Sequence, residues 1–151
     1  MSEIKRILLA EDSEKDIELT LEALEEHHLA NDVVVVRDGE EALDYLHRRG
    51  KFAGNTDVQP VLVLIDLQMP KVEGMEVLRQ IKADPELKRI PVVMMTSSRE
   101  ERDVVNSYDL GVNAYVVKPV KFVDFVDSVK QLGVFWALVN EAPPTSGAKQ
   151  L

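Results

Sequence analysis

Residues 61–74 read VLVLIDLQMPKVEG, and this stretch decides the fold. Its first five residues, Val61–Ile65, are apolar without the alternation of a half-exposed strand, which is typical of a parallel strand covered on both faces. Asp66 follows the apolar run directly. The stretch therefore predicts a buried strand with a carboxylate at its carboxyl end.

Four more short apolar runs accompany this strand, and segments with helical spacing of apolar residues separate them. The alternation predicts an α/β fold, with a parallel sheet, helices on both faces and right-handed crossovers. The other predicted strands are Ile7–Ala10, Val33–Val36, Val92–Met95 and Ala114–Val117. The first three predicted helices are marked by Ile17, Leu21 and Leu24, then by Ala42, Leu43 and Leu46, and then by Val77, Leu78 and Ile81, where Asp84-Pro85 closes the helix. The fourth begins at Ser98 with Glu101 as a capping box, and the fifth carries Phe122, Phe125, Val126, Val129 and Leu132.

The 151 residues suffice for one domain and its core. We expect a domain over residues 1–140 with an extended last helix, a flexible tail over 141–151, and a surface connector over Arg48–Gln59. A formal net charge of −9 argues against binding nucleic acid or an anionic membrane, and the absence of cysteine excludes disulfides and thiol chemistry. Without a signal peptide or a spanning segment, the expected location is the cytoplasm.

Polar residues follow four of the five strands. Because ligands bind beyond the carboxyl ends of parallel strands, we expect these residues to meet at one edge of the sheet. They are Glu11 and Asp12 after the first strand, Asp66 after the third, Thr96 and Ser97 after the fourth, and Lys118-Pro119 after the fifth, where the X-Pro bond can be cis. Arg37-Asp38-Gly39, after the second strand, resembles a helix cap.

These residue types suit phosphoryl transfer to a carboxylate. Converging carboxylates repel one another, and Mg²⁺ relieves that repulsion through oxygen ligands. An aspartate can attack phosphorus and form an acyl phosphate. A lysine supplies positive charge for one phosphoryl oxygen, and a hydroxyl donates a hydrogen bond to another. Asp66 is therefore the predicted phosphoryl acceptor, with Thr96 and Lys118 as its helpers.

The set resembles that of two-component response-regulator receiver domains of the CheY-like type. Met69-Pro70 and Gly74 resemble the continuation of the family's phosphoacceptor motif at Asp66. The resemblance implies a doubly wound sheet of strand order 2-1-3-4-5. It also implies Mg²⁺ bound by Asp12, Asp66 and the backbone carbonyl of Gln68, with Glu11 in reach of the cation. Thr96 and Tyr115 are the implied switch residues, and Lys118 is the implied lysine of the site.

Several details are similar to single-domain regulators paired with cyanobacterial phytochrome histidine kinases. These are the long connector, residues 107–120 (SYDLGVNAYVVKPV), and a fifth helix that runs into Val134-Phe135-Trp136. The implied function is a stand-alone phosphoacceptor that a histidine kinase phosphorylates on Asp66. The implied response is a changed protein-interaction surface on the fourth helix, fifth strand and fifth helix. Because residues 134–139 are an apolar continuation of the last helix, we expect this surface and the Phe135/Trp136 region to support a homodimer or to dock a partner. Such a protein is a stoichiometric acceptor that promotes its own phosphorylation and dephosphorylation, not a turnover enzyme.

Other interpretations stay open at this point. Taken singly, Glu11 and Asp12 could cap a helix, Thr96 could do the same, Tyr115 could be core packing, and Lys118 could be a surface lysine. An aspartyl-phosphate phosphohydrolase would need a second acid two residues after the nucleophile, where this chain has Gln68. A scaffold without phosphate chemistry would have lost the acceptor, an acid or the lysine. A flavodoxin-like binder would need a hydroxyl-rich loop after the first strand.

Overall fold

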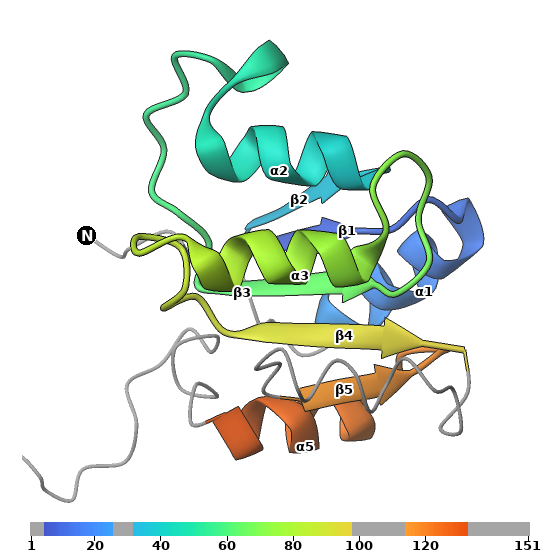
Figure 1. The fold of residues 1–151 in the computed structure, drawn as a ribbon. Helices are drawn as coiled ribbons and strands as arrows, with labels where there is room; N and C mark the ends of the chain where they lie inside the picture. Colours follow the sequence, from blue (N-terminus) through green and yellow to red (C-terminus); the bar gives the residue numbers. More distant parts are fainter. Residues whose placement is uncertain (1–4, 26–31, 98–113, 133–151) are drawn as a thin grey trace, which may run out of the picture.

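The computed structural model describes residues 5–25, 32–97 and 114–132, and for residues 131 and 132 it describes the backbone (Figure 1). Within these ranges five strands form one parallel sheet in the order β2-β1-β3-β4-β5. The predicted α/β fold and its strand order are thereby confirmed. The strands are β1 (Arg6–Ala10), β2 (Asp32–Val36), β3 (Leu62–Asp66), β4 (Val92–Thr96) and β5 (Ala114–Val117).

Helices cover both faces of the sheet, as the alternation predicts (Figure 1). Helices α2 (Gly39–His47) and α3 (Gly74–Ala83) pack on one face, and α1 (Glu14–Glu25) and α5 (Phe122–Leu132) pack on the other. The helix predicted to begin at Ser98 lies outside the described residues. So do residues 133–151, and the boundary at residue 140 and the flexible tail stay predictions. No helix in the described ranges is long and apolar enough to cross a bilayer.

The two apolar layers explain why β1 is apolar from Ile7 to Ala10 and β3 from Leu62 to Ile65. In β3, Val63 and Ile65 belong to the core under α2 and α3, whereas Leu62 and Leu64 belong to the core under α1 and α5. Strand β1 divides its side chains in the same way. A polar residue inside either strand would be buried on one face or the other, so the first polar residues come where the strands end.

Short polar signals set the helix ends where the sequence predicts them. Asp38 caps α2, since its carboxylate accepts a hydrogen bond from the Glu41 N–H at 2.8 Å. Helix α3 ends at Ala83, and Asp84 is its C-cap residue ahead of Pro85.

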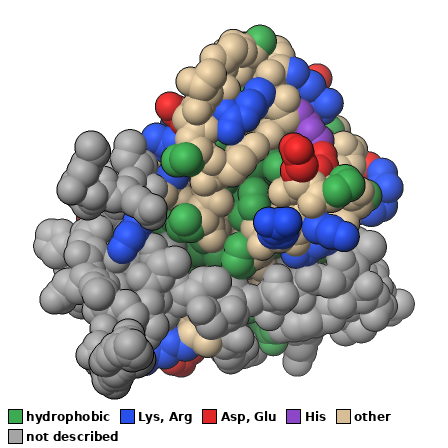
Figure 2. Space-filling model, turned by 90° about the vertical axis from the view of Figure 1, so that its left-hand side faces the viewer, with side chains coloured by type: hydrophobic (Ala, Val, Ile, Leu, Met, Phe, Trp, Pro, Cys, Tyr) green, Lys and Arg blue, Asp and Glu red, His purple; other side chains and the backbone are tan. Residues whose placement is uncertain are grey.

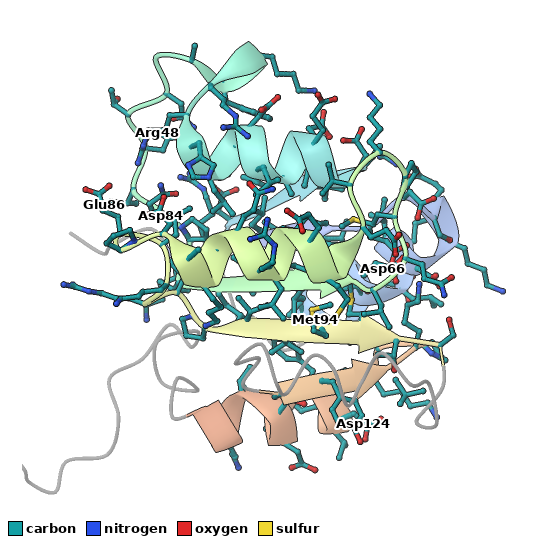
Figure 3. The ribbon with its side chains drawn as sticks, viewed as in Figure 1. Arg48, Asp66, Asp84, Glu86, Met94 and Asp124 are labelled. Atoms are coloured by element: carbon teal, nitrogen blue, oxygen red, sulfur yellow. The ribbon has the colours of Figure 1, made fainter. Side chains whose placement is uncertain are left out.

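The Arg48–Gln59 connector is more ordered than its polar sequence suggests. It contains a short 3₁₀ helix, η1 (Gly50–Phe52), and the Phe52 ring packs edge-on against Tyr45 at a centroid distance of 5.0 Å. The Arg48 guanidinium donates to the carbonyl oxygens of Asn55 and Asp57. Figure 3 shows Arg48 and Asp66 at opposite ends of the molecule, so the connector lies away from the polar edge.

The surface at the connector's end of the sheet shows hydrophobic side chains among Lys and Arg side chains (Figure 2). Val58 is the most prominent connector residue of this kind, with 61% of its surface exposed. Nearby, Arg6 of β1 is buried and pairs with Asp32 at 2.6 Å. This end is therefore held by packing and an ion pair.

Candidate functional site

The predicted site residues lie together at the carboxyl edge of the sheet, where Figure 3 places Asp66. Glu11 continues directly from β1, and its N–H donates to the Val36 carbonyl at 3.0 Å. Asp66 is the last residue of β3, and Thr96 is the last residue of β4. Lys118 follows β5, and its N–H donates to the Thr96 carbonyl at 2.7 Å. The backbone ladder itself thus brings four strand ends into register.

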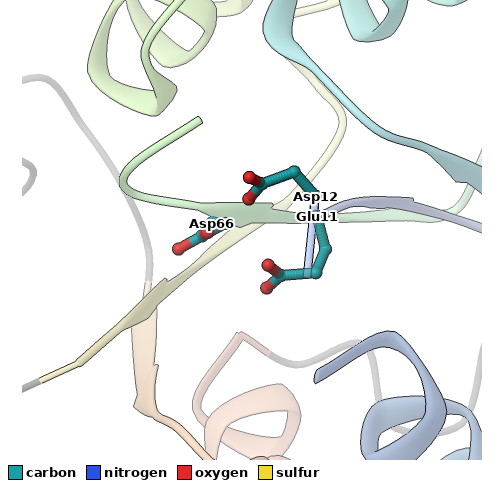
Figure 4. Close-up of side chains that lie close together, drawn as sticks. All are labelled: Glu11, Asp12 and Asp66. Atoms are coloured by element: carbon teal, nitrogen blue, oxygen red, sulfur yellow. The ribbon is translucent and has the colours of Figure 1, made fainter. Parts of the chain in front are cut away.

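Three carboxylates form a cluster at this edge (Figure 4). One oxygen from each of Glu11, Asp12 and Asp66 lies within 4.8 Å of the others. Glu11 and Asp66 are buried, and Asp12 is exposed. Since all the donors are carboxylate oxygens and one side of the cluster is open, the residues fit a hard divalent cation. The predicted acids of the metal site are therefore brought together.

Lys118 lies in the same site and is no surface lysine. Its ammonium nitrogen, Nζ, is 2.9 Å from Asp16 Oδ2, 3.2 Å from Glu11 Oε1 and 3.3 Å from Asp66 Oδ1. Only 15% of the side chain is exposed. The peptide bond between Lys118 and Pro119 is cis. A positive charge thus lies directly beside the predicted phosphoryl acceptor.

Burial and charge shift the acidity of these groups. Burial raises the pKa of Glu11 to about 7; the hydrogen bond from the Ser13 N–H opposes the rise, and the charge of Asp66 adds to it. Burial also raises the pKa of Asp66, against the opposing charge of Lys118. The pKa of Lys118 is raised above its ordinary value, because the hydrogen bond to Asp16 and the charges of Asp66 and Glu11 outweigh burial. The lysine is therefore charged at neutral pH, and the buried acids are costly to ionise together.

This cost predicts that the metal-free protein loses stability as pH rises through Glu11 ionisation. The unfolded chain releases the Glu11 proton near pH 4.5, whereas the folded protein keeps it until about pH 7. Between these values the folded state binds more protons, so the free energy of unfolding falls with rising pH, by at most about 3 kcal/mol. In EDTA, Glu11→Gln should flatten this profile and be more stable than the wild type at pH 8.

Urea unfolding at pH 5 and pH 8 measures the effect. Glu18→Gln is the matched control, because Glu18 is exposed on α1 and should keep the wild-type profile. Equal pH profiles for Glu11→Gln and the wild type would contradict the assignment of the high pKa to Glu11.

Thr96 supplies a buried hydroxyl at the site. Its side chain is buried, and among the described residues Oγ1 has no hydrogen-bond partner. A buried hydroxyl without a hydrogen bond is energetically costly. Its position at this edge therefore fits a hydroxyl that donates a hydrogen bond to a group bound at the site. The helix that Thr96 could cap lies outside the described residues, so the capping alternative stays open. Tyr115, half-buried in β5, packs against the core under α2 and α3, which agrees with the packing interpretation and leaves the switch role a prediction.

The loop after Asp66 is held tightly between two glycines. The Gln68 N–H donates to Asp66 Oδ1 at 3.4 Å, which puts the Gln68 backbone beside the acceptor. Gly74 donates its N–H to the Leu67 carbonyl at 3.1 Å, and Gly39 donates to the Pro70 carbonyl at 3.3 Å. A Cβ at Gly39 would lie 1.9 Å from the Val72 carbonyl oxygen. The loop therefore approaches both helix starts too closely for any side chain.

Gly74→Ala should disturb this loop and lower stability. Its Cβ would lie 2.3 Å from the Asp66 carbonyl oxygen and 2.9 Å from that of Leu67, and backbone atoms cannot turn aside as a side chain does. We expect a loss of about 1–3 kcal/mol in the free energy of unfolding. Urea unfolding measures it, with Glu73→Ala, an exposed neighbour, expected to stay within about 0.5 kcal/mol of the wild type. A stability equal to the wild type would show that the loop has room to move.

Two residues of the site were not predicted from the sequence. Asp16, in the first turn of α1, makes the shortest ion pair to Lys118. Ser13 donates its N–H to Glu11 Oε2 at 3.0 Å, and its Oγ accepts from the Asp16 N–H at 3.3 Å. The residue that caps α1 is therefore Ser13, whereas Glu11 accepts the Ser13 N–H ahead of the helix. Asp16 is one acid among several on α1, and nothing in its spacing marks it.

Comparison with known proteins agrees with this geometry. The sequence matches the response regulator receiver domain family over residues 7–130. Response regulator Rcp1 of Synechocystis sp. (strain PCC 6803) is 41% identical over 132 residues, which cover 87% of this chain and 88% of Rcp1. A solved Rcp1 structure, in the Mn(2+)-bound form, has a TM-score of 0.72 and 39% identity, covering 93% of this chain and 99% of that one. A related protein of the same fold thus binds a divalent cation.

Two further solved structures are similar over nearly their whole length. The bacteriophytochrome response regulator AtBRR is 57% identical with a TM-score of 0.85, covering 93% of this chain and 100% of that one. The phosphorylated cyanobacterial phytochrome response regulator RcpA is 43% identical with a TM-score of 0.75, covering 94% and 100%. The resemblance drawn from the sequence is confirmed. This chain belongs to the family of response regulator receiver domains and is similar to the phytochrome response regulators within it.

Proposed function

We propose that this protein is a stand-alone phosphoacceptor response regulator. A histidine kinase phosphorylates Asp66 in the presence of Mg²⁺, and the added charge switches a protein-interaction surface. The observation that carries the proposal is the contact of the Lys118 ammonium with Asp66 at 3.3 Å. Two further acids lie beside it, with a buried hydroxyl that has no partner among the residues the structure describes. An acceptor, a positive charge, a cation-binding cluster and a hydrogen-bond donor are the parts that this chemistry requires.

The residues divide the chemistry as follows. An Asp66 carboxylate oxygen attacks phosphorus of a phosphohistidine; the new P–O bond gives an acyl phosphate, the P–N bond breaks, and the histidine nitrogen leaves with its electron pair. Lys118 stabilises the negative charge on one phosphoryl oxygen from its place beside Asp66. The Thr96 hydroxyl, which is buried at the end of the adjacent strand, donates to another.

Glu11, Asp12 and Asp66, with the Gln68 carbonyl, would hold the Mg²⁺. The bound cation would neutralise charge shared between the acids and the phosphoryl group. The Gln68 N–H lies 3.4 Å from Asp66 Oδ1, and this closeness of the backbone to the acceptor supports the proposed role. Asp12 is the exposed member of the cluster and therefore the one through which solvent reaches the site.

The switch begins at Thr96. Once its hydroxyl binds a phosphoryl oxygen, the end of β4 is drawn toward Asp66, and Tyr115, whose strand pairs with β4, follows. The responding surface would include the fourth helix and the Phe135/Trp136 region, which lie outside the described residues. We propose that this surface supports a homodimer or docks a partner. The net charge of −9 argues against nucleic acid as that partner.

The partner that donates phosphate is proposed from the relatives. Rcp1, RcpA and AtBRR are response regulators, and the last two are named for phytochromes or bacteriophytochromes. A phytochrome-type histidine kinase is therefore the proposed donor for this chain. The chain covers 88% of Rcp1 and the full length of the solved AtBRR and RcpA chains, so the proposal draws on relatives that match nearly throughout. It would act stoichiometrically, in the cytoplasm, and not as a turnover enzyme.

Transfer from a labelled kinase tests this proposal. A bacteriophytochrome histidine kinase is labelled on its histidine with radioactive phosphate, freed of ATP and mixed with the protein and Mg²⁺. We expect the label to move to the wild type within minutes and to stay on the kinase with Asp66→Asn. No transfer to a protein that accepts phosphate from acetyl phosphate would remove the kinase assignment. Transfer to Asp66→Asn would place the acceptor elsewhere.

A further inference from the structure

Lys118 is bound most closely by a residue outside the acidic cluster. Asp16 Oδ2 accepts a hydrogen bond from the Lys118 ammonium at 2.9 Å, Glu11 accepts a second at 3.2 Å, and Asp66 makes an ion pair at 3.3 Å. Asp16 comes from the first turn of α1, 102 positions earlier in the chain. An ammonium has three N–H donors, so Asp16 and Glu11 together occupy two of them.

We propose that Asp16 is a positioning residue that holds the Lys118 ammonium against Asp66 and the phosphoryl group attached there. The proposal rests on the proposed function of Asp66 as phosphoryl acceptor. Asp16 does not contact the reacting atoms in this assignment; it acts through the lysine.

The Lys118 side chain needs such an anchor because there is open space beside it into which it could turn away from Asp66. A surface cavity of about 330 Å³ lies beside Lys118, and its lining is Lys15, Asp16, Leu19, Ser97, Lys118 and Pro119. A lysine carries its charge on a flexible four-carbon stem, and an unanchored ammonium gains hydration by turning outward. Asp16 lines this cavity and also binds the Lys118 ammonium, so its carboxylate holds the lysine back from the open space.

Glu11 cannot supply this anchor alone. It belongs to the cluster that fits a divalent cation, and its other oxygen already accepts the Ser13 N–H. A cation on the cluster would compete with Lys118 for the Glu11 carboxylate. Asp16 is not a member of that cluster, so its hydrogen bond to the lysine can persist when the cation is bound.

Asp16 is itself fixed by its helix. Its N–H donates to Ser13 Oγ at 3.3 Å, and its carbonyl accepts the Thr20 hydroxyl at 2.8 Å. Its side chain is one-quarter exposed. A carboxylate at the first turn of a helix is also favoured by the helix dipole. The anchor is therefore rigid, as an element that positions a flexible cation has to be.

The first test measures the lysine directly and does not involve phosphate. In ¹³C-lysine-labelled protein, the order parameter of the Lys118 Cε methylene should be high in the wild type and in Glu18→Ala, the exposed matched control on α1. It should fall in Asp16→Ala and fall less in Asp16→Asn, which keeps an acceptor oxygen. An unchanged order parameter in both Asp16 variants would overturn the positioning role, whether or not Asp66 accepts phosphate. Circular dichroism checks that each variant is folded.

The second test is a double-mutant cycle on the rate of phosphorylation by acetyl phosphate with Mg²⁺. We expect Asp16→Ala to lower the rate by about three- to tenfold in the wild-type background and to leave it unchanged in the Lys118→Ala background. An equal loss in both backgrounds would show that Asp16 acts without the lysine and would overturn the proposal. A wild type that takes up no phosphate would contradict the proposed function, while the order parameters would still decide the role of Asp16.

Discussion

Lys118→Ala is expected to lower the rate of phosphorylation by acetyl phosphate by about a hundredfold. The ammonium lies 3.3 Å from Asp66 and is largely buried, so its charge is already in place when negative charge develops on the phosphoryl oxygens. Removal of one such preorganised group from an active site costs about 10²–10³ in rate. The time course of the intact mass, with Mg²⁺ in excess, measures the effect.

Lys15→Ala is the matched control for this loss. Lys15 lines the same cavity as Lys118 but is exposed, so its removal should change the rate less than about twofold. Lys118→Arg should recover part of the rate, because it keeps the charge but presents it on a planar group of different reach. A Lys118→Ala protein that is phosphorylated as fast as the wild type would remove the lysine from the chemistry.

The removal of divalent cations is expected to have an equally large effect. Three carboxylates with oxygens within 4.8 Å would repel an incoming phosphoryl anion unless a cation neutralises them. We expect EDTA to lower the rate by at least about a hundredfold, and Asp12→Asn to raise the Mg²⁺ concentration for half-maximal rate by about tenfold or more. Rates measured across a Mg²⁺ titration check both expectations.

Asp124→Asn provides the control for Asp12→Asn. Asp124 is an exposed aspartate of α5, away from Asp66 in Figure 3, and its loss should leave the Mg²⁺ dependence unchanged. Calorimetric titration of Mg²⁺ separates binding from chemistry. Equal Mg²⁺ affinity in Asp12→Asn and the wild type would contradict the assignment of Asp12 to the cation site.

The sequence predicts the part of this structure that follows from periodicity. The run Val61–Ile65 predicts a strand buried on both faces, which the structure has at Leu62–Asp66, and the alternation around it favours a parallel sheet. Because every strand of such a sheet ends at the same edge, Glu11, Asp66, Thr96 and Lys118 could be placed together before any coordinate was known. The outcome is reliable because backbone pairing alone enforces it.

The contacts that a helix makes across the edge could not be predicted in the same way. Asp16 reaches Lys118 because of how α1 packs against the sheet. In the sequence it is one of several acids on an acidic helix, and nothing there distinguishes it from the others. Likewise, the close approach of Gly39 to Val72 depends on the separation of two loops, which no local pattern encodes. The sequence of the connector is that of a polar loop, yet the Arg48 guanidinium orders it by donating hydrogen bonds to the carbonyl oxygens of Asn55 and Asp57. Packing and long-range hydrogen bonds decide these features.

The measurement that tests the central claim most directly is the intact mass of the protein after incubation with acetyl phosphate and Mg²⁺. The wild type should gain one phosphoryl group, which hydroxylamine should release as expected for an acyl phosphate. Asp66→Asn, shown by circular dichroism to be folded, should gain none, and neither should the wild type in EDTA. A wild type that stays at its original mass, beside a control receiver domain that is phosphorylated, would contradict the assignment of Asp66 as phosphoryl acceptor.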